Sequence, residues 1–286
     1  MDNILEVRKL SKSYGDKKAV ENISFEIHKG DIFAFIGPNG AGKSTTIRSV
    51  VGSLEFDKGD VVICGHSVKD EPIECKKNLA YIPDTPDIYE HLTGIQYLSF
   101  IADAFRISNI ERKNKIREYA DRFEMSNALG NLISSYSHGM KQKISIIAAM
   151  IHSPKLMVLD EPFVGLDPVV RDEILDIFLE FIQDEEHSIL FSTHITSDIQ
   201  KVADYVILIH NGKIIFEEKK DDLIYNYGII RCKKSEFNTV SPDDYVCCRE
   251  TNLSVECLIH DKVAAKKRYQ NLIIDNASIE DIMLFY

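Results

Sequence analysis

The chain has 286 residues, of which 44% are hydrophobic and 28% charged, a balance ordinary for a globular protein that can bury a substantial core. Its formal net charge of −11 argues against a broad nucleic-acid-binding face, so we expect no nucleic acid partner. The longest apolar run in the middle of the chain, residues 144–151, is far too short to span a bilayer.

The first third of the chain predicts short strands and one helix. MDNILEVRKL at the N-terminus lacks the apolar region of a signal peptide, so we expect a cytosolic protein. Turn signals at Gly15-Asp16 and Lys29-Gly30 separate β-branched segments. A helix is expected from Gly42 to about Gly52. We expect strands at residues 4–7, 19–20, 23–27, 32–36, 60–65 and 79–82.

The middle of the chain changes to helical character and then returns to alternating strands and helices. From about Thr93 to Met150 helices are expected, including a charged amphipathic helix over residues 107–124. Further on, strands are expected at 156–159, 188–192 and 205–209, with a helix at 170–182. Strands separated by helices predict a parallel sheet that is covered on both faces and interrupted by a helical insert.

Residues from about 227 predict a small appended α/β module. Strands are expected at 228–232 and 255–259, and helices at 263–269 and 278–285. The six cysteines show no C-x-x-C spacing and no histidine at zinc-site distance. We interpret the adjacent Cys247 and Cys248 as strand residues on opposite faces rather than as a redox pair, because the cytosol is reducing.

A phosphate-binding loop is the most specific feature of the sequence. Residues 37–45 fit the pattern G-x-x-x-x-G-K-[ST] and follow an apolar strand. Glycines allow a tight turn whose amide groups surround a polyanion at the start of a helix. Lys43 would reach the β- and γ-phosphates, and the Ser44 hydroxyl would bind Mg²⁺. The predicted nucleotide-binding residues are Gly37, Pro38, Asn39, Gly40, Ala41, Gly42, Lys43, Ser44 and Thr45.

Two acids follow the apolar strand at residues 156–159. Asp160, at the end of a strand beside the phosphate-binding loop, would hold Mg²⁺ through water. The next residue, Glu161, is placed to polarise a water that attacks the γ-phosphate. The phosphate-binding loop upstream favours this interpretation over solvated acids that end a strand.

Ser137 begins a further predicted helix that continues to Met150. A helix that opens on serine and glycine, here Ser137 and Gly139, can recognise a second phosphate group. Taken alone, an ordinary serine cap remains the favoured interpretation.

In chain order, these features resemble the ATP-binding cassette (ABC) transporter ATPases over residues 1 to about 225. The shared pattern also includes Asp-Glu-Pro, Gly165-Leu166-Asp167 and Ser192-Thr193-His194. The usual signature is Leu-Ser-Gly-Gly-Gln. Here residues 136–140 read Tyr-Ser-His-Gly-Met, which keeps the serine and the second glycine of that signature and differs at the other three positions. This form looks like the subfamily that serves exporters of the ABC-2 type for drugs, peptides or bacteriocins.

The resemblance implies the fold class: an α/β P-loop NTPase (RecA-like) core with an N-terminal antiparallel β subdomain. It also implies a helical subdomain at about residues 87–153 within an ATPase domain of residues 1–226. Residues 227–286 would then form the small C-terminal accessory module.

Further site residues are implied by position. Tyr14 matches the aromatic that stacks on adenine, with a core aromatic as the alternative. His194 matches the switch histidine at the γ-phosphate, and Asp167 matches a residue that communicates across a dimer. Asp84 stands where the family usually has a metal-binding glutamine, and its shorter charged arm still offers oxygen ligands. Lys43, Glu161 and His194 would be catalytic; Ser44, Asp84 and Asp160 would hold Mg²⁺.

The resemblance also implies partners. Two ATP-binding subunits, expected to be a homodimer, would meet head to tail and sandwich ATP between Lys43 of one copy and Ser137 and Gly139 of the other. A transmembrane permease subunit would dock on the helical insert near residues 84–94 and hold the protein at the cytoplasmic face of the membrane.

Two other classes remain to be compared with this one. A soluble cassette ATPase that acts on ribosomes or DNA typically has two cassettes or long coiled-coil inserts, which this sequence lacks. A P-loop kinase or GTPase would leave residues 137–140 and His194 unexplained, and the sequence contains no Asn-Lys-x-Asp segment for guanine.

Overall fold

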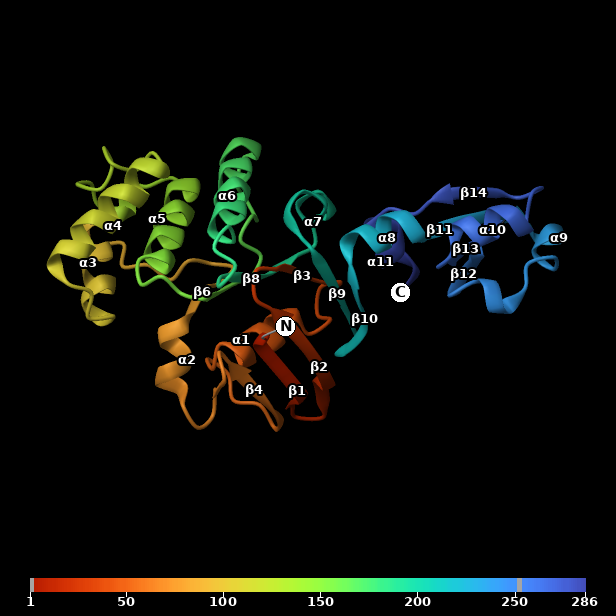
Figure 1. The fold of residues 1–286 in the computed structure, drawn as a ribbon, viewed down its shortest axis with the longest axis horizontal. Helices are drawn as coiled ribbons and strands as arrows, with labels where there is room; N and C mark the ends of the chain where they lie inside the picture. Colours follow the sequence, from red (N-terminus) through yellow and green to blue (C-terminus); the bar gives the residue numbers. More distant parts are fainter. Residues whose placement is uncertain (1–2, 251–253) are drawn as a thin grey trace.

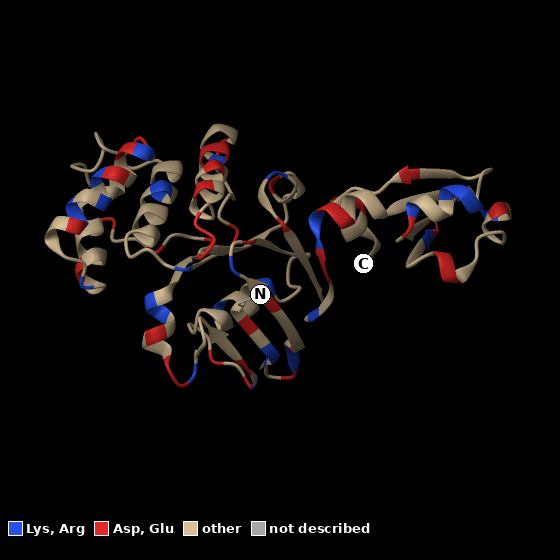
Figure 2. Cartoon of the chain, in the orientation of Figure 1, with Lys and Arg blue, Asp and Glu red and all other residues tan. Residues whose placement is uncertain are grey.

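The computed structural model describes residues 3–250 and 254–286. Its helices α3, α4 and α5 gather at one end of the molecule, two sheets occupy the middle, and a third sheet lies at the other end (Figure 1). Acidic and basic residues are interspersed along α2 and α4, whereas the charged residues of α10 are all basic (Figure 2). Within the described residues, every helix is too short or too polar to cross a lipid bilayer.

The N-terminal sheet is antiparallel with the order β2-β1-β4-β5. Its strands are β1 (Asn3–Tyr14), β2 (Lys17–His28), β4 (Lys58–Ile63) and β5 (His66–Ser67). The prediction of separate strands at 19–20 and 23–27 is wrong, because β2 runs through both. An extra residue between Val20 and Ile23 forms a β-bulge, in which Asn22 adopts φ 53 and its amide donates to the Ser11 hydroxyl at 2.9 Å.

The central sheet has the order β10-β9-β3-β8-β7-β6. Its strands are β3 (Ile32–Ile36), β6 (Leu79–Ile82), β7 (Leu156–Leu159), β8 (Ser188–Thr193), β9 (Tyr205–His210) and β10 (Lys213–Lys219). All pairings are parallel except that of β10 with β9. Every residue of β3, β7 and β8 is buried, as both faces of the sheet are covered. The sheet and its helices confirm the predicted α/β fold class.

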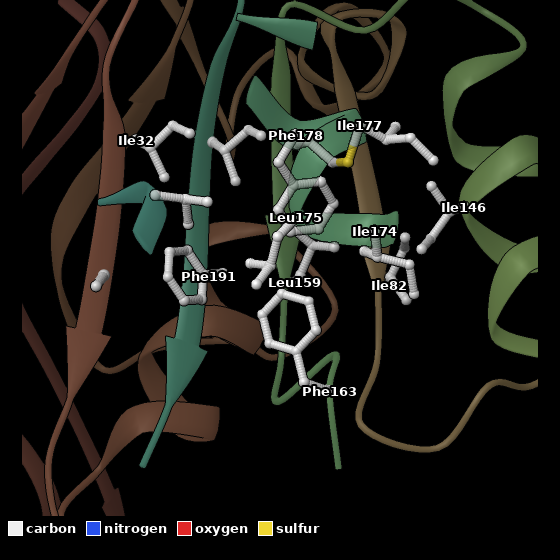
Figure 3. Close-up of a cluster of buried hydrophobic side chains, with 14 of the residues drawn as sticks. Ile32, Ile82, Ile146, Leu159, Phe163, Ile174, Leu175, Ile177, Phe178 and Phe191 are labelled. Atoms are coloured by element: carbon white, nitrogen blue, oxygen red, sulfur yellow. The ribbon is translucent and has the colours of Figure 1, made fainter. Parts of the chain in front are cut away.

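Alternate residues of β3 point into two different cores. Phe33 and Phe35 face α1 (Lys43–Val50) and the N-terminal sheet, with α2 (Pro72–Asn78) beside them. Ile32 and Ile36 face the opposite core, which α6 (Pro168–Phe181) and α7 (Thr196–Val202) cover. Figure 3 shows this second core. Each such buried side chain stabilises the fold by about 1.5–3 kcal/mol relative to exposure, so the sheet is a rigid base for the loops at its edge.

The helical insert comprises α3 (Gly94–Ala104), α4 (Asn109–Arg122), the 3₁₀ turn η1 (Ile133–Ser135) and α5 (His138–Met150). α3 begins with a capping box, in which the side chains of Thr93 and Gln96 each accept a hydrogen bond from the other residue's backbone amide. α4 begins at Ser108, whose side chain caps the helix. The amphipathic helix predicted at 107–124 is α4, with Ile116 and Ala120 on its buried face.

The C-terminal part forms a third sheet, antiparallel with the order β12-β13-β11-β14. One face has its own small core, while Ile229 and Leu258 on the other face join Leu223 in the core beneath the central sheet. The elements are α8 (Lys220–Asn226), β11 (Gly228–Lys233), α9 (Lys234–Phe237), η2 (Pro242–Asp244), β12 (Cys247–Glu250), β13 (Ser254–Ile259), α10 (Lys262–Arg268), β14 (Ile273–Asn276) and α11 (Ile279–Phe285).

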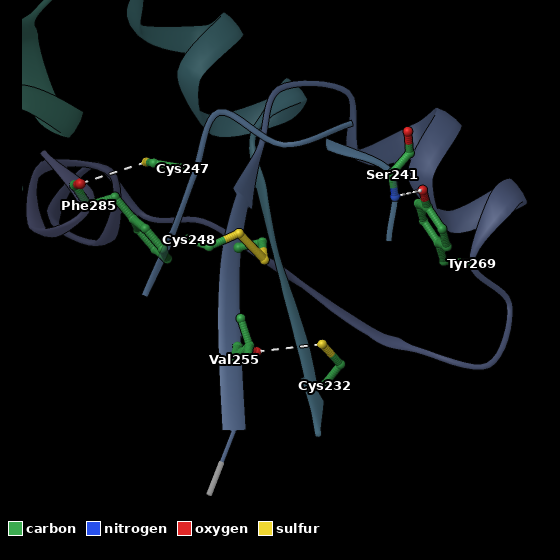
Figure 4. Close-up of a disulfide and its surroundings, with 8 residues drawn as sticks. Cys232, Ser241, Cys247, Cys248, Val255, Tyr269 and Phe285 are labelled. Atoms are coloured by element: carbon green, nitrogen blue, oxygen red, sulfur yellow. Dashed lines mark hydrogen bonds between the residues drawn. A yellow bond between two sulfur atoms is a disulfide. The ribbon is translucent and has the colours of Figure 1, made fainter. Parts of the chain in front are cut away.

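Cys248 on β12 lies directly opposite Cys257 on β13, and the two form a disulfide (Figure 4). Cys247 faces the other way, with its sulfur 3.7 Å from the Phe285 carbonyl oxygen. The prediction that Cys247 and Cys248 are strand residues on opposite faces is therefore confirmed. The disulfide itself was not expected, because it depends on the register of β12 and β13, which the cysteine spacing does not show.

Candidate functional site

The loop at residues 37–45 joins β3 to α1 and needs its glycines for space. A Cβ on Gly37 would lie 2.2 Å from the Ile209 carbonyl oxygen, and one on Gly42 would lie 2.6 Å from that of Ala19. Gly42 also has φ 114, a left-handed backbone that favours glycine. α1 then begins without a side-chain cap, so its first amide groups are free to bind an anion.

A cavity of about 250 Å³ opens at the start of α1. Tyr14, at the end of β1, lines it with 52% of its surface exposed, so the alternative of a core aromatic is excluded. An exposed ring beside a phosphate loop is suited to stacking on a base. The predicted residues that line the cavity with Tyr14 are Asn39, Gly40, Gly42, Lys43, Ser44, Thr45 and Glu161.

Three predicted catalytic side chains meet at Glu161. Lys43 is 6% exposed, and its ammonium donates to the Gly37 carbonyl oxygen at 2.7 Å. The same ammonium lies 3.6 Å from Glu161 Oε1, while His194 Nδ1 lies 3.0 Å from Glu161 Oε2. The carboxylate of Glu161 thus joins the base of the phosphate loop to the end of β8.

Ser192 fixes the two acids at the end of β7. Its hydroxyl donates to Asp160 Oδ1 at 2.6 Å and accepts from the Glu161 amide at 2.8 Å. This bond holds Glu161 at φ 47, a conformation that costs a residue other than glycine on the order of 1–3 kcal/mol. Asp160 is fully buried, and its Oδ2 has no hydrogen-bond partner among the residues that the structure describes. An unpaired buried carboxylate oxygen fits a residue that holds a hydrated cation.

The predicted signature residues start a different helix. The Ser137 hydroxyl accepts from the Met140 amide at 3.2 Å and caps α5. Gly139 lies against Val170 of α6, where an added Cβ would come within 3.4 Å. His138 reaches the Val164 carbonyl oxygen with Nε2 at 3.1 Å. Ser137 and His138 are exposed, and neither lines the cavity at the phosphate loop.

Asp167 caps α6, accepting from the amides of Val169 and Val170 at 3.1 Å each. Like Ser137 and Gly139, it lies outside the lining of the phosphate-loop cavity. One chain therefore brings together Tyr14, the phosphate loop, Asp160, Glu161 and His194, and leaves Ser137, Gly139 and Asp167 apart from them. Figure 1 shows α5 in the helical group and α1 on the other side of the central sheet.

Comparisons with known proteins decide the family. The model of the ABC transporter family matches residues 20–164, which is about half of the chain. The chain is 34% identical to the bacitracin transport ATP-binding protein BcrA of Bacillus licheniformis, over 78% of this chain and 72% of that protein. The chain belongs to the ABC transporter ATP-binding family.

Two further likenesses agree with this assignment. The SkfA peptide export ATP-binding protein SkfE of Bacillus subtilis is 35% identical over 74% of this chain and 87% of its own length. A solved ATP-binding subunit of an ABC transporter superposes with a TM-score of 0.72 at 35% identity, covering 77% of this chain and 91% of that one. The cassette therefore binds nucleotide and is an ATP hydrolase.

Asp84 lies in a neighbouring cavity of the cassette and not in the one at the phosphate loop. That cavity, about 570 Å³, is also lined by Arg48 of α1 and by Tyr81. Asp84 is exposed. Its role as a metal ligand stays a prediction from the family position.

The sequence did not single out two groups that support the site. Ser192 was noted only as part of Ser-Thr-His; the parallel pairing of Leu159 with Phe191 is what places it opposite Asp160. Arg171 of α6 donates to Asp198 of α7 at 2.5 Å and to the Ser197 hydroxyl at 2.7 Å. Asp198 is 1% exposed, and burial raises its pKa even though Arg171 opposes the shift. The pair ties the helix after Asp167 to the helix after His194.

Proposed function

We propose that two copies of this cassette close on ATP and drive a separate transmembrane permease that exports its cargo. The observation that carries the proposal is the division of the site. Lys43 and Glu161 line one cavity and His194 contacts Glu161, whereas Ser137 and Gly139 are held at the start of α5, away from that cavity. A second copy is the natural source of the missing helix start.

Within one copy, each side chain has a separate task. Lys43 would leave the Gly37 carbonyl oxygen and bind the β- and γ-phosphates, while the free amides of α1 hold the rest of the charge. Glu161 would accept a hydrogen bond from the attacking water. His194, whose Nδ1 lies 3.0 Å from Glu161 Oε2, would contact the γ-phosphate. Ser192 keeps Glu161 in place through its amide.

The residues also fit Mg²⁺. The Ser44 hydroxyl, exposed in the cavity, and the unpaired Oδ2 of Asp160 would hold the ion, directly and through water respectively. When bound, Mg²⁺ neutralises charge on the β- and γ-phosphates.

The partner copy would contribute the start of α5. Its first amides lie at the positive end of a 13-residue helix, and Ser137 and Gly139 leave room for a phosphate to approach. The γ-phosphate would thus touch both copies, so ATP favours the closed dimer and hydrolysis releases it. Asp167, at the start of α6, would face the partner across the same interface.

The relatives support the proposed permease and the proposed direction of transport. BcrA serves bacitracin transport and SkfE serves SkfA peptide export, which supports an export partner over a ribosome- or DNA-directed ATPase. We place the permease at residues 84–94, beside the 570 Å³ cavity, and the cassette at the cytoplasmic face of the membrane. The ATPase domain would end near residue 226, and residues 227–286, with their own sheet, would be an accessory module.

The proposal is tested by steady-state hydrolysis in the presence of Mg²⁺. The wild-type chain should hydrolyse ATP with a rate per chain that rises with protein concentration, because the active form is a dimer. Glu161→Gln should lower kcat by about 10²–10⁴-fold, the range for losing a general base. Ser137→Arg should abolish hydrolysis without changing ADP affinity. A wild-type rate per chain that stays constant across protein concentrations, with full activity in Ser137→Arg, would show that one chain suffices.

A further inference from the structure

The segment after Asp84 and the segment before Ser137 run side by side as a short two-stranded pairing. Thr93 and Leu132 form an isolated antiparallel bridge. We call residues 90–95 and 129–134 the paired segments. Four backbone hydrogen bonds join them: Ser134 N to Glu90 O at 3.0 Å, Ile133 N to Leu92 O at 2.9 Å, Gly94 N to Asn131 O at 3.3 Å and Ile95 N to Leu129 O at 2.9 Å.

Tyr136 ties the end of this pairing to the start of α5. Its side chain is 6% exposed, and its hydroxyl donates to the Ala128 carbonyl oxygen at 2.7 Å. A Cβ on Gly94 would lie only 2.4 Å from that hydroxyl oxygen. Gly94 has no left-handed φ, so glycine is needed here for space alone. The Tyr136 ring therefore fits only because residue 94 has no side chain.

The contact joins two functional segments. Gly94 is the first residue of α3 and the last residue of the proposed permease-docking segment, 84–94. Tyr136 directly precedes Ser137, the cap of α5. A second link runs parallel to the first, because Lys141 of α5 forms an ion pair with Glu90.

We propose that Tyr136, seated on Gly94, is a positioning residue that sets where Ser137 presents the start of α5 to the ATP of the partner copy. The inference rests on the proposed function, in which Ser137 completes the site across the dimer. Through this contact, a shift of residues 84–94 reaches Ser137 by packing and backbone hydrogen bonds, without passing through the phosphate loop.

The test introduces a methyl group at Gly94 and then makes room for it. Gly94→Ala should displace Tyr136 by about 1 Å and weaken ATP-dependent dimerisation by 10- to 100-fold, the loss that such a misplacement can cause. Gly94→Ala/Tyr136→Phe removes the oxygen at 2.4 Å and leaves contacts of 3.2 Å with Leu129, which a shift of a few tenths of an ångström relieves. It should return dimerisation to within about threefold of the parent. All variants carry Glu161→Gln, and dimerisation is measured by analytical ultracentrifugation with ATP and Mg²⁺.

Two controls separate positioning from unfolding. Gly130→Ala, in the other paired segment, adds its Cβ where no other atom of the described residues lies within 4 Å, and should dimerise like the parent. The affinity of each monomer for a fluorescent ADP should stay unchanged, because the phosphate loop is not touched.

The outcomes are distinguishable. If the parent itself stays monomeric with ATP, the proposed function fails. If the parent dimerises and Gly94→Ala dimerises equally well, the positioning role is wrong. The role is also wrong if Tyr136→Phe fails to rescue Gly94→Ala, or if ADP affinity falls together with dimerisation.

Discussion

In the proposed mechanism the chemistry depends on Glu161, whose position is imposed by its neighbours. It adopts φ 47, its amide donates to Ser192, and its carboxylate contacts Lys43 and His194. Strain at such a position persists only where surrounding bonds maintain it. Ser192 is therefore as important to the geometry as the acids themselves.

Ser192→Ala should lower kcat by at least about tenfold, because it frees the Glu161 backbone, and should destabilise the fold by about 1–3 kcal/mol, because it leaves Asp160 Oδ1 unpaired. Steady-state kinetics and urea unfolding measure the two effects. Ser188 is the matched control: it lies on the same strand, fully buried, and makes two similar bonds, to His28 O and from the Gly30 amide. Ser188→Ala should cost similar stability and leave kcat unchanged. Equal losses of kcat in both variants would contradict the assignment.

The partly buried side chain of His152 should make the free energy of unfolding sensitive to acid. It stacks on Phe105 and its Nε2 lies 3.1 Å from the Leu79 carbonyl oxygen. Burial lowers its pKa from 6.5 to about 4. Below pH 6.5 His152 binds a proton in the unfolded chain, whereas in the folded chain it stays neutral until about pH 4. The free energy of unfolding therefore falls as the pH drops from 6.5 to 4.

Between pH 7 and pH 5 this group should reduce the free energy of unfolding by about 2 kcal/mol. His152→Gln retains a donor for Leu79 but does not titrate, so its loss over the same interval should be smaller by that amount. Urea unfolding at the two pH values gives the difference. Identical pH dependence in both proteins would show that His152 is not the group.

At the scale of elements, α6 and α7 are joined by two ion pairs that differ in burial. Arg171–Asp198 is buried on the acid side, while Lys201–Asp172, at 2.9 Å, has side chains 40% and 65% exposed. Arg171→Met should cost about 3–5 kcal/mol, because it leaves a buried carboxylate unpaired. Lys201→Met should cost no more than about 1 kcal/mol.

Chemical denaturation of both variants measures the contrast, and Arg171→Met/Asp198→Leu should recover part of the loss because no charge then remains buried. A double variant less stable than Arg171→Met would contradict the argument. Since the pair joins the helix that follows Asp167 to the helix that follows His194, Arg171→Met should also lower kcat.

The sequence predicted elements where one local signal was sufficient. The apolar runs at 32–36 and 156–159 are β3 and β7, and the glycine-rich segment between β3 and α1 is a loop that leads into a helix, as predicted. β10 was missed because half-buried and exposed residues alternate along this charge-rich edge strand. The gap predicted between strands at 19–20 and 23–27 is a β-bulge inside the single strand β2. The Arg171–Asp198 ion pair depends on helix packing and the Cys248–Cys257 disulfide on strand register, and neither follows from a local sequence pattern.

At the scale of the whole molecule, the proposed function divides the site into two halves that lie apart in one chain. The phosphate loop, Glu161 and His194 form one, and Ser137 with Gly139 forms the other. The paired segments place the second half next to the proposed permease-docking segment. Assembly, ATP binding and coupling to the membrane would therefore be a single event.

The most direct test of this account is the mass of Glu161→Gln in solution with ATP and Mg²⁺. The account predicts a dimer, twice the mass of one chain, that reverts to monomer with ADP and never forms when Lys43→Ala or Ser137→Arg is added. Glu161→Gln that binds ATP and yet remains monomeric would contradict the composite site.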